Sequence, residues 1–328
     1  MSSVEQLITE NLDIWSSAIK TRSSAGRGGG KKLKLYGIEK LRELILDLAV
    51  RGLLVPQDAS EESANVLLDN IATEKAEKNK ITKNKKAKIL PEVGVEFRNE
   101  DLPKGWSWAL IPQIIADDKY SIKRGPFGSS IKKAYFVPSG YKVYEQQHAI
   151  KNDFSLGEYY VDDEKYQELS AFTVKPNDLI ISCSGTVGKV AVAPEWMEPG
   201  IINQALLKIS LNQNALINEY FKILFSAFYM KTETLNDLKG TAQKNMVSVD
   251  TLKKEPFPLP PYLEQSRIIA KVDELMALCD QLEQQQENSI SAHQTLVETL
   301  LAALTNAGEK GCFNEAWARI AEHFDTLF

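Results

Sequence analysis

Basic side chains are concentrated in one short stretch of this 328-residue chain, Lys119 to Lys133. The stretch reads Lys-Tyr-Ser-Ile-Lys-Arg-Gly-Pro-Phe-Gly-Ser-Ser-Ile-Lys-Lys and contains no acidic residue. Its glycines and serines allow the backbone to approach phosphates closely, and we expect Phe127 to anchor the loop. The surrounding segment 105–255 has 17 basic and 17 acidic residues, so the positive charge is local. A basic loop on a neutral domain is suited to contact a nucleic-acid backbone.

Amide side chains that can read base edges occur in three short groups, because Asn and Gln present a donor and an acceptor together. The groups are Gln146 and Gln147, Asn203 and Gln204, and Gln243, Lys244 and Asn245, although each also fits an ordinary surface position. Ser184 and Thr186 are candidates for phosphate contact, but the sequence 184–188 equally suits a structural hairpin turn. The candidate DNA-contacting residues are Lys119, Lys123, Arg124, Gly125, Phe127, Gly128, Ser129, Ser130, Lys132, Lys133, Gln146, Gln147, Ser184, Thr186, Asn203, Gln204, Gln243, Lys244 and Asn245.

The sequence offers few groups that converge for catalysis. The histidines at 148, 293 and 323 fall in separate predicted elements, and no phosphate-binding loop, zinc-protease or nucleophile-elbow motif occurs. Leu259-Pro260-Pro261-Tyr262 is similar to a turn of amino-methyltransferases. Leu259, however, stands where those enzymes need Asp or Asn to accept hydrogen bonds from the target amino group. We expect no catalytic residue in this chain.

The cysteine pattern and the hydropathy of the sequence indicate the cellular compartment in which this protein is expected. Cys183, Cys279 and Cys312 are far apart and form no Cys-x-x-Cys pair, so neither a disulfide framework nor a metal site is indicated. The first residues lack a basic flank with an apolar run, and no apolar stretch of about 18 residues occurs. A hydrophobic content of 43% with 25% charged residues is typical of a folded protein. We expect a cytoplasmic protein without a membrane segment.

The region 1–101 favours helices joined by basic linkers. Apolar residues recur at helical spacing in 2–20, in Ile38 to Arg51 and after Ser60, whose hydroxyl can cap the third helix. Thr21 to Lys32 is rich in glycine and is expected to be a flexible linker. Seven lysines against two glutamates in 74–88 give a charge of +5, which suits a solvated linker or a tether that contacts phosphates.

From Leu102 the pattern changes to short strands separated by glycine and proline turns. Asn218 to Met230 favours a buried helix. We expect an α+β fold, with a mixed α/β or mainly β globular domain at 102–257. Its strand-like segments are Tyr141 to Val143, Phe172 to Val174, Leu179 to Ser182, Val187 to Val192 and Ala205 to Leu211.

The longest predicted element is a helix from Tyr262 to Thr305. Four prolines between 256 and 261 delay its start, and neither Pro nor Gly interrupts it. Apolar residues alternate at spacings of four and three, which predicts a coiled coil with a helix of this chain or another, or else packing on a globular core. The spacer helix is assigned to 258–305 and a C-terminal helical segment to 306–328. The predicted helix-pairing residues are Ile268, Val272, Leu275, Cys279, Leu282, Leu296 and Leu300.

These segments, in this order and over nearly the whole chain, resemble the specificity subunit of Type I restriction-modification systems. The segment from Ile38 to Asp58 is similar to one that recurs in that family. The other matching pieces are Gly125-Pro126-Phe127-Gly128-Ser129-Ser130, Asp178-Leu179-Ile180-Ile181-Ser182 with Ser184-Gly185-Thr186-Val187-Gly188, Asn203-Gln204, Gly240-Thr241-Ala242-Gln243, and Pro258-Leu259-Pro260-Pro261 with Glu264-Gln265 and Arg267-Ile268-Ile269.

The resemblance implies that 102–257 is a target-recognition domain for double-stranded DNA, carried on helices that dock methyltransferase (modification) subunits. A separate restriction subunit would supply the motor and nuclease. This chain would bind no cofactor itself, and S-adenosylmethionine, ATP and Mg would belong to the partner subunits. The family usually carries two recognition domains, whereas this sequence shows one.

We therefore expect a chain that reads one half of a bipartite DNA site. The second recognition half would come from homodimerisation or from a missing C-terminal half. Two other classes remain open: a self-contained DNA-modifying enzyme, and a coiled-coil adaptor without DNA specificity.

Overall fold

The computed structural model describes residues 6, 8–18, 20–22, 32–81, 93, 102–229, 236–237, 245–306, 314–315, 317–318 and 320–321. The chain divides into two compact units. One contains Met1–Gln6 and Glu43–Asp273, and the other contains Leu7–Arg42 and Glu274–Phe328. Two helices, α3 (Tyr36–Val50) and α10 (Tyr262–Thr305), contribute residues to both units. The α+β class expected from the sequence is confirmed.

The smaller unit contains helix α2 (Leu12–Ser17) and the strands β1 (Lys20–Arg22) and β2 (Lys32–Lys34). These strands pair in antiparallel register, so the prediction of a flexible linker is wrong at both of its ends. The first turns of α3 pack closely on α2, since a Cβ on Gly37 would lie 2.0 Å from the carbonyl oxygen of Trp15. Arg42 of α3 bonds two carboxylates of α10, Asp280 and Glu283, each at 2.7 Å.

Helix α4 (Ala64–Ile81) begins three residues later than a helix capped by Ser60 would. The backbone N–H and the hydroxyl of Ser60 both donate to Asp58 Oδ1, at 2.9 and 2.7 Å, and so close a local turn. The residue directly before the helix is Ser63, whose Oγ accepts from Val66 N at 3.5 Å, so Ser63 rather than Ser60 lies at the capping position.

The globular domain is built around two four-stranded sheets, with strand orders β6-β5-β10-β7 and β4-β11-β8-β9. Strand β10 is parallel to β5 and antiparallel to β7, whereas the second sheet is antiparallel throughout. The strands are β4 (Ile122–Arg124), β5 (Tyr141–Tyr144), β6 (Tyr160–Val161), β7 (Thr173–Val174), β8 (Leu179–Ser182), β9 (Val190–Val192), β10 (Gly200–Ile202) and β11 (Leu206–Ile209).

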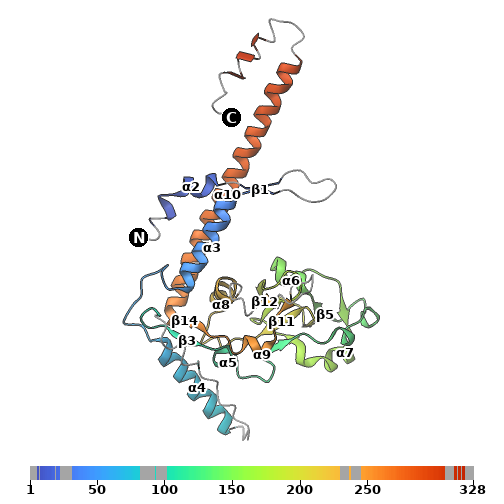
Figure 1. Cartoon of the computed structure of the whole chain (residues 1–328). Coiled ribbons are helices and arrows are strands. Elements are labelled where there is room, and N and C mark those ends of the chain that lie inside the picture. Colours follow the sequence, from blue (N-terminus) through green and yellow to red (C-terminus); the bar gives the residue numbers. More distant parts are fainter. Residues whose placement is uncertain are drawn as a thin grey trace. The chain divides into compact units, whose positions relative to one another are not determined.

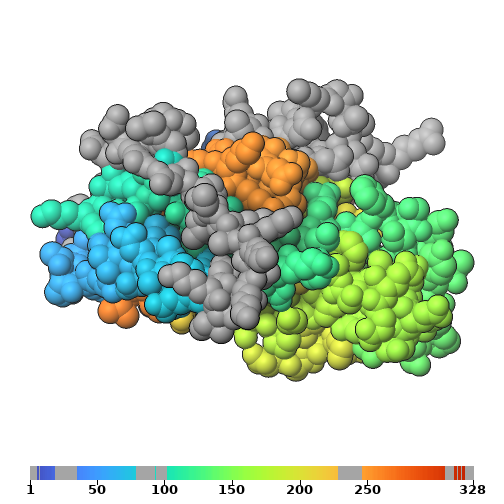
Figure 2. All heavy atoms as spheres, turned by 90° about the horizontal axis from the view of Figure 1, so that it is seen from below, coloured from blue at the N-terminus to red at the C-terminus, as the bar shows by residue number. Residues whose placement is uncertain are grey.

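Short helices connect these strands. The predicted strand at 172–174 is shorter than expected, because 170–172 forms a 3-10 turn before β7. The predicted helix at 218–230 appears as α8 followed by a π-helical segment, with 230 outside the described residues. The helices are α5 (Ile111–Ile114), α6 (Gln146–Lys151), α7 (Asp163–Glu168), α8 (Asn218–Leu224), the π-helical segment Phe225–Tyr229 and α9 (Val249–Leu252). Figure 2 shows the segment containing α9, in orange, directly against the green surface of the same domain.

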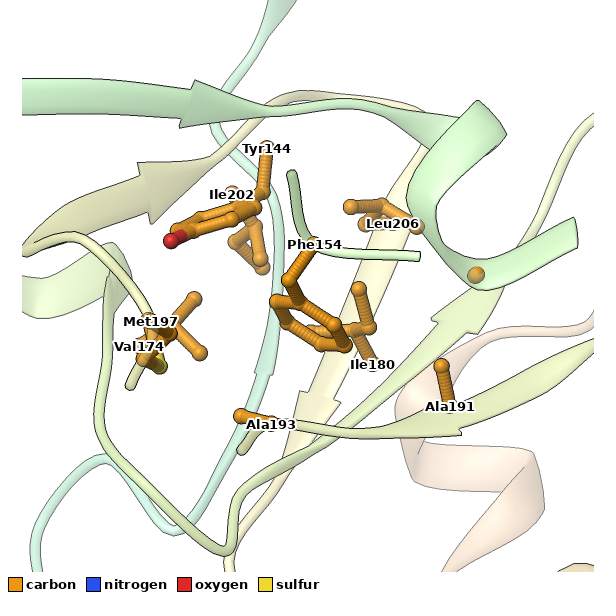
Figure 3. Close-up of a cluster of buried hydrophobic side chains, with 10 residues drawn as sticks. Tyr144, Phe154, Val174, Ile180, Ala191, Ala193, Met197, Ile202 and Leu206 are labelled. Atoms are coloured by element: carbon orange, nitrogen blue, oxygen red, sulfur yellow. The ribbon is translucent and has the colours of Figure 1, made fainter. Parts of the chain in front are cut away.

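The sheet that contains β5 and β10 is buried on both faces. Because successive side chains of a strand point to opposite faces, Val143 and Ile201 join one apolar cluster while Tyr144 and Ile202 join another. Figure 3 shows the second cluster, in which Tyr144 and Ile202 face Phe154. The core therefore fixes the positions of the loops that leave both sheets.

Helix α10 spans Tyr262–Thr305, as the proline and glycine pattern predicted, and is one continuous helix in Figure 1. Its first turn is locked into the globular domain. Trp106 Nε1 donates to Glu264 Oε1 at 3.0 Å, and neither Glu264 nor Gln265 has exposed surface. The amide of Gln265 accepts from Ile217 N at 2.9 Å and donates to Ala215 O at 3.1 Å.

Two further contacts complete this joint, which we define as Trp106, Glu264, Gln265 and Arg267 with their partners. Arg267 forms an ion pair with Glu61, which lies before α4. Strand β14 (Phe257–Leu259) pairs antiparallel with β3 (Ser107–Ala109), directly before the helix begins. The motif Glu-Gln-x-Arg is thus a structural device that ties the start of α10 to the domain.

The predicted pairing residues of α10 fall into two groups. Ile268, Val272, Leu275 and Cys279 are buried. Leu282 and Leu300 are partly exposed, and the side chain of Leu296 is 39% exposed. In the described part of α10, no residue after Cys279 is buried.

Candidate nucleic-acid interface

Three loops meet at one edge of the sheet β4-β11-β8-β9. Strand β11 is antiparallel to both β4 and β8, so the ends of β4 and β8 lie beside the start of β11. Gly125 N donates to Leu206 O and Cys183 N donates to Ala205 O, each at 2.8 Å. We call the surface formed by residues 124–130, 146, 184 and 203–204 the loop edge.

Gly125 and Asn203, which are far apart in the sequence, are in backbone contact at the loop edge. A Cβ on Gly125 would lie 1.8 Å from the carbonyl oxygen of Asn203, so only glycine fits this position. Arg124 Nε also approaches the carbonyl oxygen of Gln204, at 3.5 Å. The structure therefore brings together Arg124, Gly125, Asn203 and Gln204, which the sequence had singled out separately.

The side chains of this group differ in how much of their hydrogen-bonding capacity is exposed to a ligand. Asn203 is 9% exposed, and its Oδ1 accepts from Ala205 N at 3.0 Å, so its amide shapes the turn. Gln204 is exposed. Arg124 is partly exposed and carries the positive charge of the loop edge.

Gln146 lies at the first position of α6 and reaches the same edge. Its Oε1 accepts from Ser184 N at 3.2 Å. His148 holds this helix in place, because its Nδ1 accepts from Glu145 N at 2.9 Å and its Nε2 bonds Leu156 O at 2.7 Å. His148 is fully buried and therefore positions the helix. The neighbouring Gln147 donates to Glu145 Oε2 at 3.2 Å.

Phe127 does not anchor its loop, and that expectation is wrong. Its side chain is 88% exposed, whereas the flanking Pro126 and Ile131 are buried. Residues Gly128–Ser130 form a 3-10 turn, with Ser130 N donating to Phe127 O at 2.8 Å. The two buried neighbours are the anchors that sequence reasoning missed. Ile131 is the lone apolar residue between Ser130 and Lys132, and this isolated apolar position was the signal that could have identified it as an anchor.

The lysines of the basic stretch fall in different surroundings. Lys119 Nζ lies 4.8 Å from the centroid of the Tyr120 ring. Lys123 is partly buried, with its Nζ 5.2 Å from the Phe172 ring centroid. Lys132 and Lys133 are exposed beyond Ile131, in and next to the 3-10 turn Lys133–Tyr135. The structure thus separates Lys119 and Lys123, whose ammonium groups lie over aromatic rings, from Lys132 and Lys133.

The segment 184–188 forms the hairpin turn between β8 and β9, so the structural interpretation is confirmed. Gly188 N donates to Ser182 O at 2.8 Å, and Gly185 has a φ of +67°, which favours glycine. Thr186 is exposed in this turn.

Strand β13 (Asn245–Met246) brings a further backbone segment to the loop edge. It pairs with β12 (Asn236–Asp237), and Met246 N donates to Cys183 O at 3.0 Å. Gln243 and Lys244 lie outside the described residues. Cys183 is fully buried and burial raises the pKa of its thiol to about 12, so it is a packing residue rather than a nucleophile.

In the described residues, no group of three or more His, Cys, Asp and Glu side chains is arranged to hold a metal ion. No helix within those same ranges is long and apolar enough to cross a membrane. Leu259 is fully buried in β14, opposite Ser107, and its backbone belongs to a strand pair. This position therefore offers no open pocket for an extruded base.

The family model described as Type I restriction modification DNA specificity domain matches residues 127–292, just over half of the chain, and the chain belongs to this family. It is 40% identical over 345 residues to the Type I restriction enzyme EcoAI specificity subunit of Escherichia coli. It is 38% identical over the same length to the EcoEI specificity subunit of that organism.

Each of these two alignments covers 99% of this chain and 54% of the relative, so the chain spans about half the length of these curated relatives. A chain from a structural study of assembly and conformational transition of the type I R-M system has a TM-score of 0.46 and 16% identity. That alignment covers 89% of this chain and 66% of the other. The HsdS subunit from Thermoanaerobacter tengcongensis has a TM-score of 0.42 and 19% identity, covering 86% and 62%.

Proposed function

We propose that this chain reads one half of a bipartite DNA site for a Type I restriction-modification complex. The observation that carries the proposal is the meeting of Arg124, Gly125, Gln146, Ser184 and Gln204 at the loop edge of a domain that belongs to the specificity family. Basic, amide and hydroxyl groups from separate loops are the donors and acceptors that duplex recognition requires.

Within this proposal, the loop edge and the lysines that follow it divide their contacts between phosphates and bases. Arg124 and the exposed Lys132 and Lys133 contact the DNA backbone, which makes binding strongly dependent on salt. The exposed amide of Gln204 reaches a base edge. Asn203 supports the turn, since its amide oxygen is already bonded.

The chain acts as a non-catalytic scaffold in this assignment. Separate modification subunits supply S-adenosylmethionine and methyl transfer, and a restriction subunit supplies the ATP- and Mg-dependent motor and nuclease. The curated relatives are named as specificity subunits, which favours this role over a self-contained modifying enzyme or an adaptor without DNA specificity. The burial of Leu259 also argues against a methyltransferase site at the Pro-Pro-Tyr turn.

The second half of the site is read by another recognition domain, either in a second copy or in the rest of a longer protein. Two observations support it. The curated relatives are about twice as long as the aligned region. Leu296 and Leu301, in the distal half of α10, are 39% and 53% exposed, which suits a helix that pairs with another.

The proposal is tested by mapping methylated adenines in a genome with and without this gene, followed by binding assays on the mapped sequence. A variant with four basic residues of the stretch changed to Ala should bind every duplex more weakly. The slope of log affinity against log salt should fall by about 0.9 for each phosphate that the variant no longer neutralises. The four positions are Lys123, Arg124, Lys132 and Lys133.

A control of equal charge change uses lysines elsewhere in the domain, and it should bind as the parent does. Equal binding by the variant of the basic stretch and the parent at the same salt would show that this stretch, which runs into the loop edge, does not contact DNA. A methylation pattern that is unchanged without the gene would refute the function itself. The control positions are Lys104, Lys175, Lys222 and Lys254.

A further inference from the structure

Phe127 is the most exposed large apolar side chain in the described part of the chain, at 88%. Trp196 follows at 66%. Exposing an aromatic ring to water is unfavourable, because its apolar surface stabilises a protein only when it is buried.

The exposure of Phe127 is imposed by the loop that carries it. Pro126 and Ile131 are buried on either side, and Ile131 belongs to the apolar cluster that contains Val143 and Ile201. Gly125 is bonded to β11 through Leu206 O. The 3-10 turn is closed by the bond from Ser130 N to Phe127 O, at 2.8 Å. Because both ends are fixed, the ring is presented outward on a preformed turn.

The surroundings of the ring suit a nucleic acid. Arg124 precedes it and Lys132 and Lys133 follow it, and the stretch 119–133 has no acidic residue. The space next to the ring is open, since a Cβ on Gly128 would meet no atom within 4 Å. The arrangement is complementary to duplex DNA. The ring can stack on the face of a base, and the cations on either side of it can contact the phosphates of the two strands. A membrane surface would instead require several apolar side chains together.

We propose that Phe127 inserts as a wedge between two adjacent base pairs of the target duplex and partly unstacks them. The inference rests on the proposed DNA-recognition function and gives Phe127 a specific role in it. The flanking cations hold the phosphates while the ring stacks on a base. Since the cost of unstacking depends on the step, Phe127 selects a deformable pyrimidine–purine step without hydrogen-bonding to it.

The test uses the complete specificity subunit in complex with its modification subunits, and the duplex mapped by adenine methylation. Phe127→Ala should weaken binding to this duplex by about 5- to 150-fold, the range for loss of one aromatic–base stack. The slope of log affinity against log salt should stay at the parent value, because no charge is lost. Phe127→Leu should retain part of the affinity as a smaller wedge. Trp196→Ala is the matched control and should bind as the parent does.

A second readout reports the wedge directly. 2-Aminopurine placed at successive steps of the target should brighten at one step when the parent complex binds, and Phe127→Ala should abolish that signal. Binding by Phe127→Ala within twofold of the parent, or no brightening at any step with the parent, would overturn the wedge and leave DNA recognition intact. Failure of the parent complex to prefer the mapped duplex would overturn the proposed function and the wedge together.

Discussion

Glu264, at the start of α10, should make the stability of the globular domain depend on pH. The residue has no exposed surface, and Trp106 Nε1 donates to its Oε1. Its Oε2 is buried without a hydrogen bond. Burial raises the pKa of the Glu264 carboxyl to about 7, against the lowering effects of Trp106 and Arg267, while Glu61 raises it further. The ordinary value is 4.5.

The sign and size of the effect follow from these two values. Between about pH 4.5 and pH 7 the folded chain keeps a proton on Glu264 that the unfolded chain has released. Stability therefore falls as the pH rises, by about 1.4 kcal/mol for each pH unit and by about 3 kcal/mol over the whole window. The contribution of protonated Glu264 to the free energy of unfolding is fully present below about pH 4.5 and is lost as the pH rises through about 7.

Glu264→Gln should remove this dependence, because the amide has the shape of the protonated carboxyl and still accepts from Trp106. The free energy of unfolding, measured by urea titration at half-unit steps from pH 5 to pH 8, should rise in the variant relative to the parent as the pH increases. Other titrating groups, such as Asp178, are present in both proteins and cancel in the difference. Parallel pH profiles for parent and variant would refute the reasoning.

Two further perturbations test the packing of the loop edge and of the helices. Gly125→Ala should cost about 1–3 kcal/mol of stability and weaken target binding, because its Cβ overlaps the backbone of Asn203, whereas Gly128→Ala meets nothing and should stay within about 0.5 kcal/mol. Urea titration and binding assays on both variants check this, and equal effects would contradict the close contact. Arg42→Ala should cost about 0.5–1 kcal/mol by removing two partly exposed ion pairs with α10. The cost should shrink in 1 M salt, and a salt-independent cost in denaturation experiments would argue against an ionic role.

The sequence correctly predicted those helices and strands whose position is determined by residues close together in the chain. The α10 helix follows from prolines that prevent an earlier start and from the absence of later breakers. Strand β8 follows from the three consecutive apolar residues that begin it, and all four of its residues, Ser182 included, are buried. The start of α4 was placed at Ser60 rather than at Ser63, because serine is favoured both in turns and at helix N-caps and the two uses look alike in a sequence.

The loop edge could not be assembled from the sequence, because its contacts join distant residues. Nothing near Gly125 indicates that Asn203 will lie against its backbone, and nothing near Ser184 indicates Gln146. Strand alternation also divides the basic stretch, since Lys123 lies over the Phe172 ring whereas the next residue, Arg124, approaches Gln204. Charge clustering in a sequence therefore overstates how many of the charges act together.

The joint at the start of α10 draws on none of the residues of the loop edge. Trp106, Ala215, Ile217 and Glu61 hold Glu264, Gln265 and Arg267. The tips that carry Phe127 and Gln204 belong to other turns. Exchange of the tip residues therefore leaves the attachment of the helix unchanged. Under the proposed function, a lineage with this architecture could acquire a new target by altering a few exposed side chains, without changing the residues that attach the helix to the domain.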